Sequence, residues 1–238
     1  MRPILTAILS TAAVTATAAA AEGLVSRSYN VGNFSGVEVA GPYNVEIRTG
    51  QRVSVSGTGT PRLMEKTVVE VKGDRLVIHP QRENNWFGGN WNWMRDEKAR
   101  FVVTVPQLNA ATIAGSGNVN VDRVRGQRFD GRVAGSGNLQ LGSLEVQDAK
   151  FGIAGSGDAR VLGGRVGSAN YSIAGSGAVQ AAALAAQNAK ISIAGSGDVA
   201  ARASGSADIS IMGSGDVVIT GGARCNVSKM GSGRARCS

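Results

Sequence analysis

The chain has 238 residues, of which 25 are lysine or arginine and 17 are aspartate or glutamate, giving a formal net charge of +8 at pH 7. The basic residues are scattered and interleaved with acids, so we expect no nucleic-acid-binding surface. One histidine, His79, and two cysteines are too few for a zinc cluster or a recognisable Ser/His pair, and we expect neither a metal nor a cofactor.

The first 21 residues are typical of a secretory signal peptide. Arg2 supplies a positive start, an apolar alanine-rich stretch follows, and Ala19-Ala20-Ala21 forms an A-x-A cleavage site before Glu22. This stretch is too short to span a membrane, and no later segment reaches a spanning length. We therefore expect cleavage near Ala21, no membrane span, and a periplasmic or secreted protein.

Residues 22–110 are predicted to form an irregular β region that continues or caps the regular repeats after it. VAGPYNVEI, Val39–Ile47, overlays the later segment IAGSGNVNV. VSVSGTGT, Val53–Thr60, overlays the later segment ISIAGSGD. Both are interpreted as degenerate copies of the repeat, although antiparallel pairing is also possible in this region.

An insertion at 84–98 contains all three tryptophans of the chain and lies between two predicted strands, DRLVIHP and ARFVVTVP. Trp91 and Trp93 would share one face of an extended segment. Exposed aromatic rings beside Asn and Arg can stack on sugars or anchor a protein partner. Alternatively, they form a lid over apolar surface. The candidate binding residues are Trp86, Phe87, Trp91, Trp93 and Arg95.

Residues 111–238 carry a repeat built around the tripeptide Gly-Ser-Gly. Successive copies begin 20 residues apart and, in the last two steps, 18 residues apart. Positions two and four before each copy, and four and six after it, are mostly apolar, and the residues between them are mostly polar. This period-two alternation predicts a strand on each side of a Gly-Ser-Gly corner. The copies begin at Gly115, Gly135, Gly155, Gly175, Gly195, Gly213 and Gly231.

The repeat predicts an all-β fold, a parallel β-helix or solenoid with 20 and then 18 residues per coil. Short alternating strands cannot close a core alone, whereas stacked coils bury each inward column against its copy in the next coil. The crossover rule for parallel strands favours right-handed winding. The glycines and the alternation of Ser and Ile disfavour helices.

The residue after each corner is polar in most coils, and the resulting row has two interpretations. Stacked aspartates could bind calcium, as in nonapeptide-repeat solenoids, but this motif lacks that period and Ala178 interrupts the row. Capping of the turn by bonds to backbone N–H groups is the favoured interpretation. The row comprises Asn118, Asn138, Asp158, Asp198 and Asp216.

Cys225 and Cys237 flank the last corner, and both occupy columns that point inward. In an oxidising compartment we expect them to form a disulfide that pins the last coil, whose open end would otherwise fray. Redox catalysis is the alternative, but the spacing is not Cys-x-x-Cys.

These motifs together resemble the putative auto-transporter adhesin head GIN-domain family. The resemblance rests on FSGVEVAGPYNVEI, on a VTVPQL segment and on serial IAGSGDV units, and it covers residues 30–236. It implies a β-helical domain of an exported bacterial protein and brings no catalytic residues with it.

We therefore expect a non-enzymatic, adhesin-like binding or structural domain at the bacterial envelope or cell surface. Its partner would be an envelope protein or a surface glycan. Two alternatives remain: a carbohydrate-active enzyme that uses aspartates of the corner row, and a purely structural envelope protein.

Overall fold

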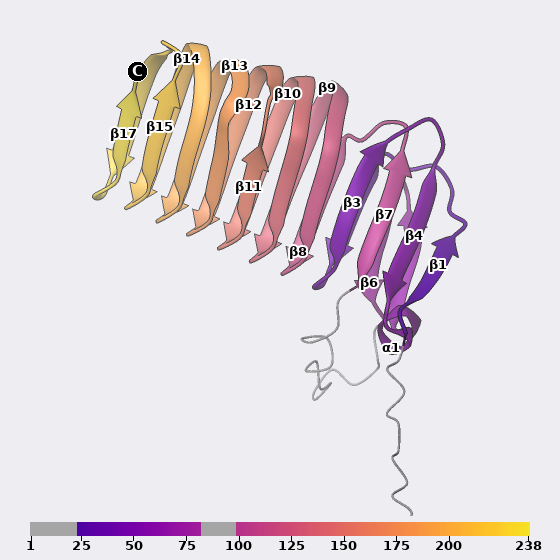
Figure 1. The fold of residues 1–238 in the computed structure, drawn as a ribbon. Helices are drawn as coiled ribbons and strands as arrows, with labels where there is room; N and C mark the ends of the chain where they lie inside the picture. Colours follow the sequence, from indigo (N-terminus) through magenta and orange to yellow (C-terminus); the bar gives the residue numbers. More distant parts are fainter. Residues whose placement is uncertain (1–22, 82–98) are drawn as a thin grey trace, which may run out of the picture.

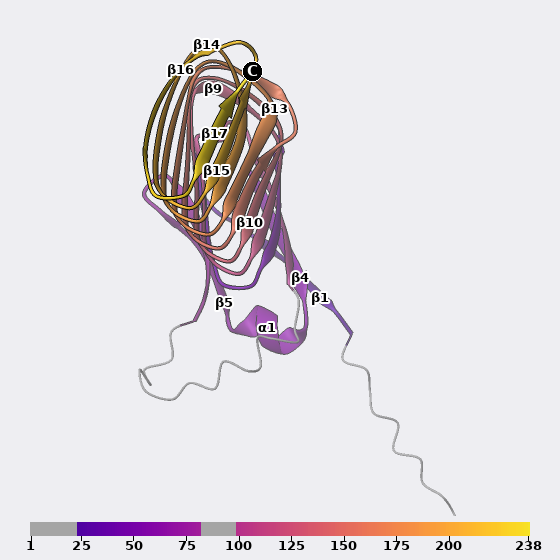
Figure 2. The same cartoon turned by 90° about the vertical axis from the view of Figure 1, so that its left-hand side faces the viewer.

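The computed structural model describes residues 23–81 and 99–238, and its strands form one 17-stranded sheet wound into a solenoid (Figure 1). The solenoid has about 6 turns with a spacing of about 20 residues. Viewed from its end, the coils stack as closed loops around a common interior (Figure 2). The predicted all-β solenoid is confirmed. Within the described residues, no helix is long and apolar enough to cross a membrane.

The regular coils are parallel and in register. Phe151 pairs with Tyr171, which pairs with Ile191 in the next coil, so equivalent positions of the repeat lie side by side. The strands of these coils are β8 (Ala110–Gly115), β9 (Asn118–Gly135), β10 (Asn138–Gly155), β11 (Asp158–Val161), β12 (Gly164–Gly175), β13 (Ala178–Gly195), β14 (Asp198–Gly213), β15 (Asp216–Thr220), β16 (Arg224–Met230) and β17 (Arg234–Cys237).

The core consists of the apolar columns that the repeat predicts, because each inward side chain contacts its copy one coil away. Ile153, Ile173 and Ile193 are buried in one such column. Phe151 and Tyr171 extend another, with ring centroids 5.8 Å apart in a stacked arrangement. The core therefore contains columns of large side chains beside columns of alanines.

Each Gly-Ser-Gly tripeptide turns a corner that stacks directly on the corner of the preceding coil. The first glycine has a positive φ, +132° at Gly175, a conformation that side chains disfavour. At the second glycine, a Cβ at Gly177 would lie 2.1 Å from the carbonyl oxygen of Gly157. The amide of Ser176 donates a hydrogen bond of 2.9 Å to the carbonyl of Gly155. The amides of Ser176 and Gly177 are thus bonded to the preceding coil and are not available to cradle an anion.

The coil shortens from 20 to 18 residues between β13 and β14. The missing residues are accommodated between Ala181 and Asn188. The register is regular up to Ala181, which pairs with Ala201, and shifts twice before Asn188, which pairs with Ser206. The corners and the strands on either side of them keep their register through this change.

The N-terminal region extends the solenoid with further parallel strands and adds an antiparallel end. Its elements are β1 (Val25–Tyr29), β2 (Gly36–Ala40), β3 (Asn44–Thr49), β4 (Ser54–Gly59), α1 (Pro61–Glu65), β5 (Thr67–Lys72), β6 (Arg75–Pro80) and β7 (Arg100–Val105). β2 and β3 pair in parallel with β8 and β9, and Val39 lies beside Ile113, as the overlay of the two segments predicts. β6 and β7 pair with the other side of β2 and β3.

VSVSGTGT does not form a corner, and of the two possibilities for this region it takes the antiparallel pairing. This segment forms β4, which runs antiparallel to β1 and β7 without turning at its glycines. Gly57 is needed instead for packing, because a Cβ there would lie 2.5 Å from the Phe101 ring. The helix α1 was not predicted from the sequence. Thr60 caps it by accepting a hydrogen bond from the Leu63 amide. β1, β4, β5 and α1 lie together at the N-terminal end of the solenoid (Figures 1 and 2).

Candidate binding surfaces

The tryptophan-rich insertion joins the solenoid between β6 and β7. The candidate residues Trp86, Phe87, Trp91, Trp93 and Arg95 lie outside the described residues, but both attachment points are described. Gln81 donates its amide to the Lys66 carbonyl at 2.7 Å, and the buried Ala99 accepts a hydrogen bond of 3.1 Å from the Asn44 amide. Ala99, the first described residue after the insertion, is therefore held beside the first residue of β3.

A polar groove of about 710 Å³ lies beside this second attachment point. Its side chains come from strands that are distant in sequence but adjacent in the sheet: β3, β7, β9 and β10. Asn120 and Gln140 are exposed, and among the described residues neither side chain has a hydrogen-bond partner. The polar groove is lined by Asn44, Glu46, Arg100, Asn118, Asn120, Asp122, Asn138 and Gln140.

Charged side chains in the polar groove are held in place by ion pairs. Glu46 binds Arg100 through one carboxylate oxygen and Arg48 through the other. Arg100, and then Arg48, lowers the pKa of the Glu46 carboxyl, so it stays ionised at neutral pH. Asp122 accepts hydrogen bonds from both the amide and the hydroxyl of Thr49. The free donors and acceptors in the groove are therefore mainly its amides.

The row after the corners forms a hydrogen-bonded ladder of two kinds, one between asparagine side chains and one between aspartates and backbone amides. At the N-terminal end, Asn138 donates its side-chain amide to Asn118 at 2.8 Å, and Asn118 donates to Asn44 at 3.0 Å. Farther along, each aspartate accepts a hydrogen bond from a backbone amide of the next coil: Asp158 from Ala178, Asp198 from Asp216, and Asp216 from Arg234. Through these hydrogen bonds the aspartate carboxylates join adjacent coils. In the part of the chain that the structure describes, no cluster of metal-binding side chains is found.

His79 is held inside a hairpin formed by β5 and β6. Its Nε2 lies 2.7 Å from Glu70, and its Nδ1 lies 2.8 Å from the carbonyl oxygen of Pro80. Lys72 pairs with the same carboxylate at 2.7 Å. Both ring nitrogens thus contact acceptors of the protein itself, which is the geometry of a histidine that ties two strands together.

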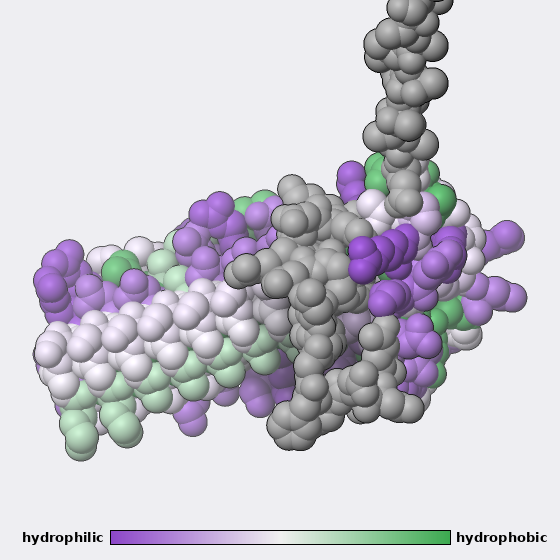
Figure 3. Space-filling view, turned by 90° about the horizontal axis from the view of Figure 1, so that it is seen from below, coloured by the Kyte–Doolittle hydropathy of each residue, from purple (hydrophilic) through white to green (hydrophobic). Residues whose placement is uncertain are grey.

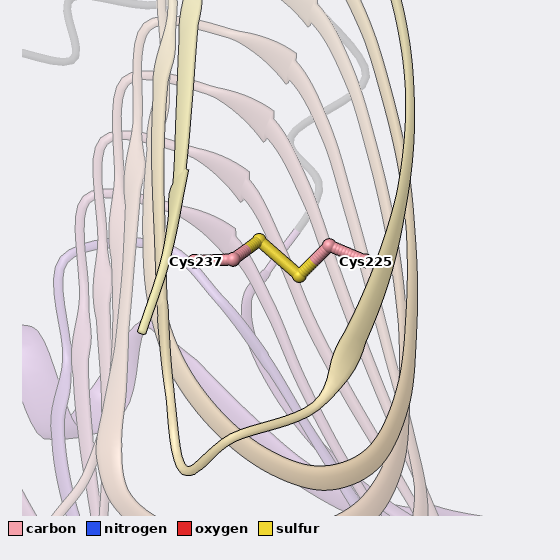
Figure 4. Close-up of a disulfide and its surroundings, with 2 residues drawn as sticks. All are labelled: Cys225 and Cys237. Atoms are coloured by element: carbon pink, nitrogen blue, oxygen red, sulfur yellow. A yellow bond between two sulfur atoms is a disulfide. The ribbon is translucent and has the colours of Figure 1, made fainter.

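A disulfide between Cys225 and Cys237 closes the last coil, as the sequence predicts. It joins β16 to β17 across the open end of the solenoid, with the two Cα atoms 6.6 Å apart (Figure 4). The neighbouring residues Ala223 and Ala235 are only partly buried. The bridge therefore ties together the two strands of the last described coil, where apolar packing is incomplete.

The fold defines a parallel β-solenoid whose last coil is closed by a disulfide. Residues 33–223 match the family described as "Putative auto-transporter adhesin, head GIN domain". The match covers most of the chain, and the protein belongs to this family. The family and the disulfide both indicate an exported, adhesin-like surface domain, and the family is not described as one of enzymes.

Several solved structures share the fold. A putative adhesin from Bacteroides fragilis superposes with a TM-score of 0.81 and 23% identity over 91% of this chain and 98% of that one. A putative lipid binding protein from Parabacteroides distasonis gives 0.69 and 23% over 90% and 96%. A putative adhesin from Parabacteroides merdae gives 0.69 and 17% over 90% and 96%. The comparison with curated proteins gave no match. At this identity the structural likeness establishes the fold.

Proposed function

We propose that the protein is a non-enzymatic adhesin-like domain that binds a surface glycan of the bacterial envelope through the polar groove and the tryptophan-rich insertion. The observation that carries the proposal is the position of the groove. Arg100, the first residue of β7, lines it directly after the insertion ends. Residues 84–98 carry the aromatic rings in the sequence, and the groove supplies polar groups beside Arg100, two residues after the insertion.

The chemistry of the groove suits a ligand rich in hydroxyl groups. An amide side chain both donates and accepts hydrogen bonds, as a sugar hydroxyl does. Asn120 and Gln140 stand in register on adjacent strands, about 4.8 Å apart, and present such groups in a row. Aromatic rings add stacking surface for the apolar faces of a sugar. An envelope protein could use the same residues, and is the second candidate partner.

Two other functions have less support. A carbohydrate-active enzyme would need a carboxylate pair free to transfer protons or attack a sugar. The aspartates of the corner row instead accept backbone hydrogen bonds from the next coil. A purely structural role leaves the unpartnered amides of the groove and the tryptophans of the insertion without a purpose.

The test compares binding with stability. The double substitution Trp91→Ala with Trp93→Ala, and separately Asn120→Ala with Gln140→Ala, should weaken retention on envelope glycans while leaving thermal unfolding nearly unchanged. Thr112→Ala with Ser172→Ala, on the strands before the corners, is the matched control and should bind normally. A large loss of stability in the tryptophan variant would identify the insertion as a lid and contradict the proposal. Release of reducing ends from a polysaccharide would favour the enzyme.

A further inference from the structure

The last coil of the solenoid is strongly basic. From Arg224 to Ser238 it has four basic side chains and no acidic side chain. Among the residues that pair with this coil, Asp208 and Asp216 are acidic, and only Asp216 approaches a basic group, at 3.9 Å from Arg234. All four basic side chains are exposed. We call this set the basic tip: Arg224, Lys229, Arg234 and Arg236.

The disulfide organises the basic tip. Arg224 directly precedes Cys225, and Arg236 directly precedes Cys237, so the bridge links the backbone on both sides of the coil (Figure 4). Because neighbouring side chains along a strand point to opposite faces, the cysteines point inward and the two arginines outward. The positive charges are consequently fixed on both walls of one end instead of on a loose chain end.

Exposed apolar side chains lie next to the basic tip. Met212 and Met230 are adjacent in register and are 60% and 72% exposed. They end a row that is alanine in the earlier coils and that runs along the pale band of corner residues in Figure 3. Val227, an inward residue of the last coil, is 42% exposed. The end of the solenoid thus combines positive charge with flexible apolar side chains.

The geometry of this end disfavours another β-strand as its partner. β16 and β17 each pair on one side only, which leaves edges that an extended chain can join. However, Lys229 stands in the inward column where Ile211 stands one coil earlier, so an added strand would have to pack on a charge. A second copy docked through the same end would also bring its own four positive charges against these. A flat surface needs no pairing with the strand edges and brings no positive charge. It can also contact side chains of β16 and β17 at the same time.

We propose that the basic tip, with Met212 and Met230, docks the protein on an anionic phospholipid surface. The basic side chains pair with phosphate headgroups, and the methionines enter the boundary between headgroups and acyl chains. This surface lies at the opposite end of the solenoid from the polar groove. The docked protein would therefore stand on its C-terminal end and hold its N-terminal half away from the lipid.

The proposal is tested by co-sedimentation of the disulfide-bonded protein with vesicles of equal parts phosphatidylcholine and phosphatidylglycerol. Vesicles of phosphatidylcholine alone should not bind. Each basic residue at an anionic surface contributes about fivefold to binding, so Arg224→Gln with Arg236→Gln should weaken it about 25-fold. The control, Arg128→Gln with Arg165→Gln, removes the same charge from exposed positions in the middle of the solenoid and should bind as the wild type does.

Three results would overturn the proposal. They are equal loss of binding in the tip and control variants, equal binding to both kinds of vesicle, and binding to poly-glutamate without binding to vesicles, which would indicate an acidic peptide partner. Replacing Met230 with Gln should reduce vesicle binding while leaving its salt dependence intact. The variant Trp91→Ala with Trp93→Ala should still bind vesicles, so failure of the glycan proposal and failure of this one are separately visible.

Discussion

Replacing Tyr171 with phenylalanine should make the protein more stable. The Tyr171 side chain is fully buried, and its hydroxyl has no hydrogen-bond partner among the described residues. A buried hydroxyl without a partner costs about 1–3 kcal/mol in mutational data. The phenylalanine ring would keep the stacking on Phe151, at 5.8 Å between centroids. The expected gain in the free energy of unfolding is therefore about 1–2 kcal/mol.

The same change at Tyr43 is the matched control, because that hydroxyl is hydrogen bonded. Tyr43 is also fully buried, but its hydroxyl lies 3.2 Å from the hydroxyl oxygen of Thr67. Tyr43→Phe should therefore destabilise the protein by about 1 kcal/mol. Two identical chemical deletions are thus expected to have opposite signs.

Urea denaturation followed by circular dichroism measures both variants. For a chain of this size, 1 kcal/mol corresponds to about 2–4 °C in melting temperature, so thermal scans give a second reading. If Tyr171→Phe proves less stable than the wild type, the hydroxyl is hydrogen bonded in solution and the reasoning is refuted. Equal shifts in both variants would show that the hydrogen-bonding state of the hydroxyl does not determine the effect.

Three other measurements probe the corners, the last coil and the alkaline limit. Gly175→Ala should lower the free energy of unfolding by about 1–3 kcal/mol because of the positive φ at this position. In Gly152→Ala the new Cβ would have no contact closer than 4.0 Å, so this variant should not be destabilised. Urea denaturation that ranks the two variants otherwise would contradict the corner geometry. Removing both Cys225 and Cys237 should cost about 3 kcal/mol and speed hydrogen exchange in β16 and β17 but not in β10. Burial raises the pKa of Tyr171 above its ordinary 10.0, so the unfolded chain ionises first and stability should fall as pH rises above that value. Tyr171→Phe should flatten this alkaline fall, and an unchanged pH profile would assign it to other groups.

The regular coils could be predicted in detail because each obeys the same local rule. Ile193 and Val199 can be assigned to the core from their spacing to one corner, and the corner itself is marked by three residues. Parallel stacking then repeats that assignment in every coil. The disulfide followed from the same columns, since Cys225 stands in a column of alanines and Cys237 in a column of apolar residues, both at inward positions.

The N-terminal end was harder to predict because its pairing is not periodic. VSVSGTGT has the composition of a corner, but Gly57 serves the packing of Phe101 in an antiparallel strand. The short helix had a usable local signal, a threonine at the cap followed by Pro61. The polar groove had none, since Glu46, Arg100 and Asn120 come together only through strand pairings between distant parts of the chain.

The order of the first coils has a consequence for how the chain acquires its structure. β2 and β3 lie between β6 and β7 on one side and β8 and β9 on the other, so Asn44 finds its partners only at Arg100 and Asn118. The beginning of the chain cannot complete its sheet until well over a hundred residues have emerged, and such distant closure is slow. Each later coil needs only the one made just before it. For a chain delivered across a membrane N-terminus first, the first coils would form slowly and the later coils would then add rapidly. Each new coil would also oppose backward movement of the chain.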